Sequence, residues 1–254
     1  MRRGVRRDLL LLFAFLADVR AEVSLNTAYK RCWWPEYQPD SLYTAVSRMV
    51  KVGELGREVD RKGNVILRLR ARGGWLLDDV LPLRKLRKRP WDKKWRLVIF
   101  DIPEKTRGVR DGVREKLKQL GFGMWQKSVY VTPHDVMNEM NEYLENQVLF
   151  PSVVCFESQR TGFGSDREFA NEIFFSEKRN LQYLEIVEQA SDLEHLWEEK
   201  KLAKQKYVRR VQRLWERFRE LEFSDPFLPQ ELLPKEWYAE SARKAIRRIG
   251  TTSP

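Results

Sequence analysis

The chain of 254 residues is longer than most single domains, so two or three modules are expected. Hydrophobic residues make up 42% and aromatic residues 12%, which is enough to bury hydrophobic cores. Lys and Arg outnumber Asp and Glu by 48 to 37, which favours a polyanionic partner because cations neutralise phosphates and release counterions. A soluble protein with a basic surface is the alternative. Cys32 and Cys155 lie far apart and give neither a disulfide framework nor a metal motif, so a reducing cytoplasm is expected.

The first 21 residues resemble a secretory signal peptide, because basic residues are followed by an apolar run from Leu9 to Ala17 and then by small residues. This run is too short to span a bilayer, which needs roughly 20 apolar residues. We expect a buried first helix here, because the residues that follow have the pattern of a domain that requires one. A signal peptide is the alternative.

Residues 8–78 have the pattern of a winged helix. A first helix is expected over Asp8 to Val19, and a second from Ser24 to Lys30. A third is expected to begin at Asp40 as N-cap and to end at Gly53. Its apolar face consists of Leu42, Ala45, Val46 and Met49.

The polar side of this third helix carries donors and cations suited to a major groove and its flanking phosphates, namely Tyr43, Thr44, Ser47, Arg48 and Lys51. A hairpin is expected next, from strands at residues 55–59 and 65–69 around the turn at 60–64. Its cations would reach the backbone or the minor groove, and they are Arg57, Arg61 and Lys62. Three helices followed by a hairpin predict DNA binding. The alternative is a packed helix whose polar side is simply solvated.

The densest basic run lies at residues 84–96, where eight Lys and Arg residues accompany one acid, Asp92. We expect a linker here, either merely solvated or adding phosphate contacts. Trp91 and Trp95 are interpreted as packing anchors rather than as base stackers.

A compact β-α-β unit is expected at the centre of the chain. The apolar run within Arg96 to Ile102 predicts a strand buried on both faces, and an amphipathic helix with a basic side follows as far as Gly121. Trp125 to Val131 predicts a second strand, residues 136–144 a further helix and Val153 to Phe156 a third strand. The order β-α-β-α-β predicts a ferredoxin-like fold.

The C-terminal part is expected to be helical. Gly162 and Gly164 are interpreted as a turn, because the phosphate-loop Lys is missing. From Asp166 to about Leu221, apolar residues at spacings of three and four predict helices packed on the core or between subunits. After a proline-rich stretch, a short helix is expected to start near Trp237.

Three separated stretches carry short motifs. The central unit contains Asp101-Ile102-Pro103, Leu120-Gly121-Phe122 and Gln126-Lys127-Ser128-Val129. The third helix contains Thr44-Ala45-Val46-Ser47-Arg48-Met49. The end of the chain contains Asp225-Pro226, Leu228-Pro229, Leu232-Leu233-Pro234 and Trp237. In these motifs the chain resembles the PaaX family of bacterial transcriptional repressors, and its central unit is also similar to the second of the small CRISPR adaptation proteins.

The chain departs from the family pattern at two places. Tyr43 stands where members commonly have Arg, so the operator sequence is not expected to carry over, and Tyr238-Ala239 replaces the usual Pro-Gly. In the family, an acyl-coenzyme A thioester of an aromatic acid releases the repressor. The resemblance implies that such an effector binds between the central and C-terminal parts. A constitutive DNA binder that has lost this response is the alternative.

An enzyme interpretation depends almost wholly on Asp101. At a strand end this carboxylate could bind a divalent metal, with its mate across a dimer, and activate water for phosphodiester cleavage. The alternative is a structural Asp101 that accepts turn hydrogen bonds or pairs with Arg107 or Arg110. His134 and His195 have no partner that indicates a triad or a metal site.

We therefore predict an α+β protein that is not an enzyme, needs no cofactor or metal and is not a membrane protein. The expected modules are a winged helix-turn-helix at 1–83, a basic linker at 84–94, a ferredoxin-like dimerisation domain at 95–175 and a helical region at 176–254. The expected function is that of a homodimeric, cytoplasmic repressor that reads double-stranded DNA. A metal-dependent nuclease, or a nucleic-acid-binding protein without sequence preference, is the alternative.

Overall fold

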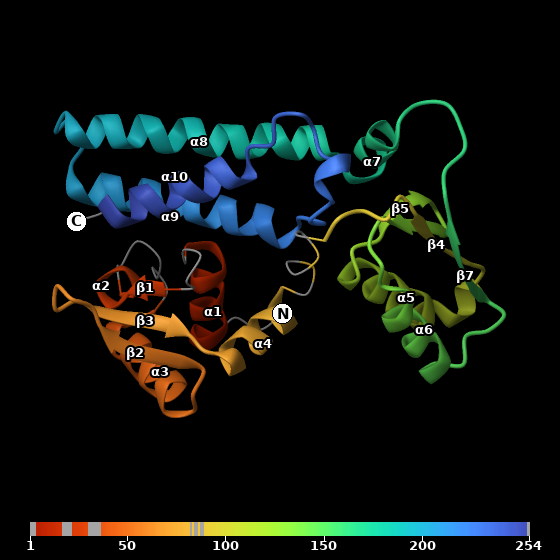
Figure 1. Cartoon of the computed structure of the whole chain (residues 1–254), viewed down its shortest axis with the longest axis horizontal. Helices are drawn as coiled ribbons and strands as arrows, with labels where there is room; N and C mark the ends of the chain where they lie inside the picture. The colour runs from red at the N-terminus through yellow and green to blue at the C-terminus, as the bar shows by residue number, and fades with distance from the viewer. Residues whose placement is uncertain are drawn as a thin grey trace. The chain divides into compact units, whose positions relative to one another are not determined.

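The computed structural model describes residues 4–16, 22–29, 37–81, 83, 86 and 89–252 (Figure 1). The protein is α+β and forms two compact units, which are not consecutive in sequence. Unit 1 consists of residues 1–81, 179–224 and 237–254, and unit 2 of residues 82–178 and 225–236. The linear modules expected from the sequence therefore regroup, because most of the C-terminal helical region packs with the N-terminal elements.

The N-terminal part of unit 1 combines helices with a small sheet. Its elements are α1 (Val5–Leu16), β1 (Glu22–Ser24), α2 (Leu25–Ala28), α3 (Pro39–Lys51), β2 (Leu55–Val59), β3 (Val65–Leu69) and α4 (Ala71–Val80). The strands are antiparallel in the order β1-β3-β2, with Leu55 opposite Leu69 and Val59 opposite Val65. The predicted hairpin is confirmed residue by residue. Strand β1 was not predicted, because three residues are too few to show a periodic pattern.

The expected helix boundaries need correction. Helix α3 has Gln38 rather than Asp40 as its N-cap, because Pro39 occupies the first helical position, where its missing N–H is not needed. Its predicted end is confirmed, since Gly53 follows with a φ of 76°, a conformation that glycine adopts without strain. Helix α1 begins three residues before Asp8. The predicted end at Val19 lies outside the described residues. The second helix, α2, ends at Ala28, two residues before the predicted Lys30, and Tyr29 is already in a turn.

Three C-terminal helices complete unit 1, namely α8 (Ser176–Glu198), α9 (Lys204–Phe223) and α10 (Ala239–Thr252). Every residue of α1 from Leu9 to Phe15 is buried. The Phe15 ring makes edge contacts with Trp215 and Phe218 of α9, at centroid distances of 5.9 and 5.6 Å. Helix α10 contacts both α1 and α9. The apolar N-terminal run is therefore a core helix, as the preferred interpretation expected.

A buried ion pair joins α9 to α10 in this core. Glu222 accepts hydrogen bonds from Nη2 of Arg243 at 2.6 Å and from Nε at 3.1 Å. The Tyr183 hydroxyl of α8 donates to the same carboxylate at 2.9 Å. Tyr183, Glu222 and Arg243 are all buried, so the three helices meet at one shared polar contact.

Unit 2 contains a ferredoxin-like sheet and the elements around it. They are β4 (Trp95–Phe100), η3 (Glu104–Thr106), α5 (Arg107–Gln119), β5 (Gly123–Gln126), β6 (Val129–Thr132), α6 (Met137–Asn146), β7 (Val153–Ser158), α7 (Asp166–Phe174) and η4 (Gln230–Leu232). The strand order is β5-β6-β4-β7, with all neighbours antiparallel. Helices α5 and α6 lie side by side on one face of the sheet (Figure 1) and share a core with Val98 and Phe100. The predicted fold of the central unit is confirmed.

Two strand predictions in this unit were wrong in detail. The single strand expected over Trp125 to Val131 is a hairpin, because the chain turns at Lys127 and Ser128 and continues as β6. Strand β4 is not buried on both faces, since the Ile99 side chain is 37% exposed. Helix α7 and η4 cover only the Trp95 end of that second face.

Candidate nucleic-acid interface

The polar side of α3 is exposed along its length. Tyr43, Thr44, Ser47, Arg48 and Lys51 are all exposed, whereas Leu42, Val46 and Met49 are buried against the core of unit 1. The amphipathic pattern places these five candidate residues on the solvent side, where a nucleic acid can reach them. No hydrogen bond or ion pair within the described part of the chain occupies the Arg48 guanidinium.

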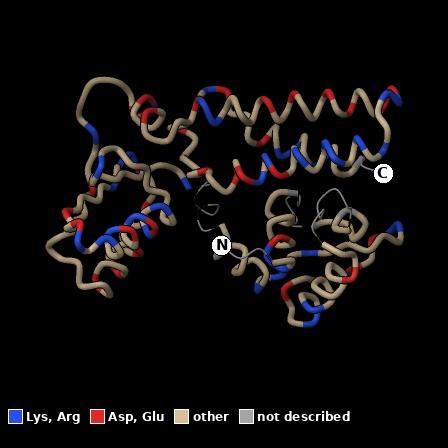
Figure 2. Tube along the Cα trace, turned by 180° about the vertical axis from the view of Figure 1, so that it is seen from behind, with Lys and Arg blue, Asp and Glu red and all other residues tan. Residues whose placement is uncertain are grey.

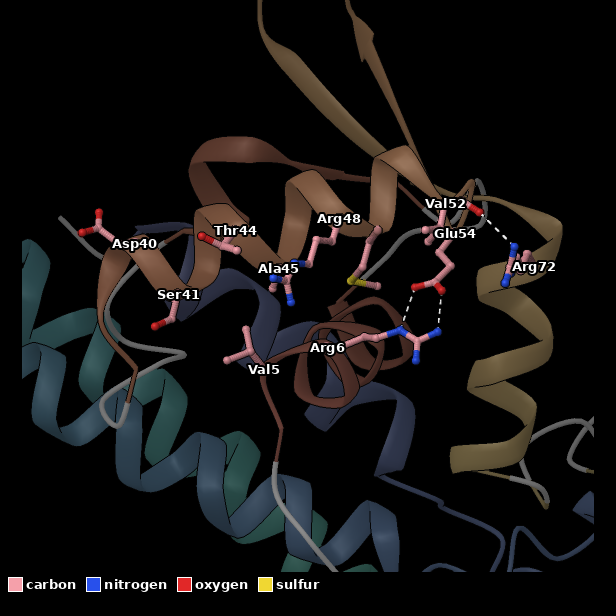
Figure 3. A pocket seen from close by; sticks show the side chains of 11 residues that line it. Val5, Arg6, Asp40, Ser41, Thr44, Ala45, Arg48, Val52, Glu54 and Arg72 are labelled. Atoms are coloured by element: carbon pink, nitrogen blue, oxygen red, sulfur yellow. Dashed lines mark hydrogen bonds and ion pairs between the residues drawn. The ribbon is translucent and has the colours of Figure 1, made fainter.

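A groove of about 720 Å³ runs beside α3, and it divides the candidate residues into two groups. Thr44 and Arg48 line it together with Ser41, Arg6 of α1 and Arg72 of α4, as Figure 3 shows. Tyr43, Ser47 and Lys51 do not line it. Sequence reasoning missed Arg6 and Arg72, because they come from helices that are distant from α3 along the chain.

Two acids line this groove, the exposed Asp40 and the buried Glu54, and Glu54 is neutralised by Arg6. Glu54 is 1% exposed and accepts a hydrogen bond from Nε of Arg6 at 2.9 Å, and a second guanidinium nitrogen also contacts the carboxylate. The bond to Glu54 raises the pKa of Arg6. Arg72 donates to the Val52 carbonyl at 3.3 Å. That carbonyl is neutral, so Arg72 keeps its positive charge, and the groove presents Arg72 together with Arg48, next to the Thr44 hydroxyl.

An aromatic pair flanks the other side of α3. The Tyr43 ring lies 4.3 Å from that of Tyr29, which follows α2, and Tyr43 is 55% exposed. Burial raises the pKa of the Tyr29 hydroxyl, and the positive charge of Arg57 opposes this rise. The Arg57 side chain of β2 is itself exposed. Tyr29 was not predicted as part of the site.

The hairpin turn is held by one carboxylate. Asp60 accepts hydrogen bonds from the backbone N–H groups of Lys62 and Asn64, both at 2.8 Å, and from the Asn64 amide at 3.0 Å. These bonds, with that from the Asn64 side chain as the largest cause, lower the pKa of Asp60. Arg61 and Lys62 are exposed at the tip. The turn therefore presents two cations on an ordered support.

The basic linker is only partly described, since Arg84, Lys85, Arg87 and Lys88 lie outside the described residues. Arg96, at its end, is 2% exposed and donates to Asp92 at 2.8 Å and to the Pro133 carbonyl at 3.3 Å. Lys94 pairs with Glu157 at 2.6 Å. This end of the basic run therefore stabilises unit 2 rather than forming a free cationic surface.

Asp101 is exposed after β4, and its carboxylate receives no hydrogen bond or ion pair from the described residues. The expected pairing with Arg107 or Arg110 was wrong. Arg107 pairs with Asp111 at 3.6 Å, and Arg110 donates to the Ile102 carbonyl at 2.9 Å. Within the described residues, no three His, Cys, Asp or Glu side chains gather as a metal site would require.

His134 has a structural environment. Its ring is buried, and Nε2 lies 2.8 Å from the Pro226 carbonyl, which fixes the segment 225–236 to the sheet unit. Burial lowers the pKa of this imidazole and keeps it neutral. His195 is exposed on α8. Neither histidine lies beside a nucleophile within the described contacts.

Comparisons with known proteins connect this fold to one family. A family model described as the PaaX protein central Cas2-like domain matches residues 88–170, and one described as the PaaX-like protein C-terminal domain matches residues 175–252. The transcriptional repressor PaaX of Escherichia coli (strain K12) is 25% identical over 164 residues, which cover 63% of this chain and 51% of that protein. The chain thus spans about half the length of this curated relative.

A solved structure shows the same fold over nearly the whole chain. An uncharacterized protein from Mycobacterium tuberculosis superposes with a TM-score of 0.55 at 16% identity, covering 98% of this chain and 96% of the other. Among the described residues, no helix has both the length and the apolar character needed to cross a bilayer. The two family models together match more than half of the sequence, and the chain belongs to the PaaX family.

Proposed function

We propose that this protein is a transcriptional repressor that reads double-stranded DNA as a homodimer and catalyses no reaction. In this proposal residues 4–81 form a winged helix, α3 enters the major groove and the β2-β3 turn contacts the backbone. The observation that carries the proposal is the exposed polar side of α3 beside two exposed cations on an ordered hairpin. The similarity of the chain to the transcriptional repressor PaaX of Escherichia coli also supports the proposal.

The charge distribution favours the same unit. Unit 1 contains 29 Lys and Arg residues against 20 Asp and Glu, whereas unit 2 contains 19 against 17. Nearly all of the net positive charge therefore belongs to the unit that carries α3 and the hairpin. Such an excess of positive charge attracts the phosphate backbone of DNA, and this attraction weakens as salt screens the charges.

The direct test is fluorescence anisotropy of the protein on the DNA upstream of its own gene, against scrambled DNA of equal length. The titration is repeated across a salt series with magnesium present. Tighter binding to the native sequence that survives moderate salt, with the DNA intact, supports a sequence-reading repressor. Equal and salt-sensitive binding to both DNA sequences, or shortened DNA, would overturn the proposal. Shortened DNA would favour the nuclease alternative, which uses the Asp101 carboxylate.

Arg48→Ala is expected to weaken binding to the native site by about 1–3 kcal/mol if its guanidinium reads a base. The side chain is exposed and has no internal partner among the described residues, so removing it costs little stability. Lys118→Ala, an exposed cation on α5 of unit 2, is the matched control. The same loss on scrambled DNA would show that Arg48 contacts phosphate instead.

Lys62→Ala is expected to reduce the slope of log affinity against log salt by about one, because one phosphate contact would be lost. Asp60 and Asn64 form the turn without the Lys62 side chain, so the hairpin stays ordered. The measurement is the salt series on both DNA sequences. An unchanged slope would remove the hairpin tip from the interface.

We also propose that a small effector of the acyl-coenzyme A type binds this protein and releases it from DNA. Unit 2 has a cavity of about 390 Å³ whose walls include the aromatic side chains of Trp95, Trp125 and Phe169 and the cation Arg160. The Trp125 and Phe169 rings meet edge to face at 5.3 Å, and flat apolar walls of this kind suit an aromatic acyl group. Such an effector would release DNA only by binding more tightly to a conformation that does not fit the operator.

A further inference from the structure

An exposed aromatic ring near the start of α3 rests on a second ring. Tyr43 is the fifth residue of this helix, and its ring centroid lies 4.3 Å from that of Tyr29, with the two ring planes tilted by 40°. Tyr43 is 55% exposed, whereas Tyr29 is half-buried and packs against the core of unit 1. The core therefore supports Tyr29, and Tyr29 supports a ring that faces solvent.

The support beneath Tyr43 is itself fixed. The backbone N–H of Tyr29 donates to the Leu25 carbonyl at 3.0 Å, and the neighbouring Ala28 is fully buried. A ring that is already held loses little rotamer freedom when it meets a ligand, so Tyr43 is preorganised. Lys51 on the same helix is exposed and has a long side chain, which must be ordered on binding.

The position of Tyr43 along α3 gives its ring access to base edges. In helix-turn-helix domains the N-terminal residues of the recognition helix are those that contact bases. Tyr43 lies in the second turn of α3, and Ser47 follows it by four residues on the same exposed side. Leu42 and Val46 point into the core instead. If α3 enters the major groove, this ring therefore enters with it.

The chemistry of the major groove matches an apolar ring to one base. Guanine, adenine and cytosine present hydrogen-bonding atoms there, whereas thymine also presents its C5 methyl group. Contact between an apolar side chain and this methyl group distinguishes thymine from cytosine, and Phe is one of the residues that make it. The Tyr43 ring offers the same kind of surface, and it is the aromatic member of the five exposed candidate residues on α3.

We propose that Tyr43 is a specificity-determining residue whose ring contacts the C5 methyl group of a thymine in the major groove, and that Tyr29 is a positioning residue that holds this ring. The proposal rests on the DNA binding proposed above and names a base feature that such binding would read. The alternative is a bond from the Tyr43 hydroxyl to a phosphate, which would carry no sequence information.

Removing the methyl group from the DNA tests this contact. The DNA upstream of the gene is synthesised once with thymine and once with uracil at every thymine position, because uracil pairs in the same way but lacks the C5 methyl group. Fluorescence anisotropy gives the dissociation constant of each DNA for the wild type, Tyr43→Phe, Tyr43→Ala and Tyr29→Ala. Trp75→Ala removes an exposed aromatic ring of α4 and is the matched control. Circular dichroism verifies that each variant is folded.

The wild type is expected to bind uracil DNA at least about threefold more weakly than thymine DNA, because burying one methyl group contributes a factor of roughly four. Tyr43→Phe and Trp75→Ala should keep this factor, since both retain the ring of residue 43. Tyr43→Ala should lose it. Tyr29→Ala should reduce it, because the Tyr43 ring is then unsupported and must be ordered on binding.

Three results would overturn the proposal. They are equal affinity of the wild type for the two DNAs, a uracil effect that persists in Tyr43→Ala, and a uracil effect that disappears in Tyr43→Phe. An unchanged factor in Tyr29→Ala would exclude its positioning role. Each of these results leaves the proposed function intact while the wild type still prefers the native sequence to scrambled DNA. Loss of that preference would overturn the proposed function and this inference together.

Discussion

Replacing Glu222 with Ala is expected to lower the free energy of unfolding by about 3–5 kcal/mol. The substitution leaves the buried Arg243 guanidinium and the Tyr183 hydroxyl without the carboxylate that both use. Breaking a buried ion pair from one side costs far more than the pair itself contributes, because the remaining charge loses its principal buried partner. Denaturant titration followed by circular dichroism measures the change.

The neighbouring acid Glu240 gives the control, because it pairs with the same Arg243 at 3.3 Å but its side chain is 52% exposed. Glu240→Ala is expected to cost at most about 1 kcal/mol, since water screens that pair. A chain with both Glu222→Leu and Arg243→Met should lose less stability than Glu222→Ala, because no buried charge remains. If Glu222→Ala cost no more than Glu240→Ala, the buried pair would not be a stabilising contact.

Trp215→Ala is expected to cost about 3–5 kcal/mol, the range for removing a large buried aromatic side chain. Trp215 is 2% exposed and packs between Phe15 of α1 and Phe218 of its own helix. Its loss leaves a cavity where the N-terminal and C-terminal segments of unit 1 meet. Trp75→Ala is the matched control, because Trp75 is 71% exposed, and its effect should stay below about 1 kcal/mol.

The coupling between the N-terminal and C-terminal segments of unit 1 can also be measured through DNA binding. Because α1 shares a core with α9 and α10, the N-terminal elements should melt together with the C-terminal helices in one transition. Anisotropy on DNA should therefore be lost at the same denaturant concentration as the helical signal, in the wild type and in Trp215→Ala. Two separate transitions within unit 1 would contradict this coupling.

Local patterns predicted most elements of this chain. The β2-β3 hairpin follows from alternation around residues 60–64, and the polar side of α3 follows from the spacing of its apolar residues. The break between β5 and β6 was missed, because the stretch from Trp125 to Val131 contains no Gly, Pro, Asn or Asp to mark a turn. Only the turn at Lys127 and Ser128 separates the strands, and Ser favours turns less strongly than Asn or Asp.

The sequence pattern did not predict contacts between segments that are distant along the chain. The groove beside α3 combines Arg6 and Arg72 with Arg48, and nothing local indicates that these three arginines lie together. The α3 face was predicted because one helix supplies it, whereas the groove depends on three helices that meet through tertiary packing. Likewise, the apolar run of α1 predicted burial but not its partners in α9 and α10.

The order of unit 1 and unit 2 along the chain has a consequence during synthesis. The core around α1 needs α9 and α10, and α10 follows α1 by more than 200 residues along the chain. At about 5–20 residues per second, the nascent α1 waits roughly 10–45 s for α10. Its apolar surface stays uncovered meanwhile, while unit 2, lacking only residues 225–236, has most of its residues early. This polypeptide is therefore expected to need holdase protection at its N-terminal end while it is translated.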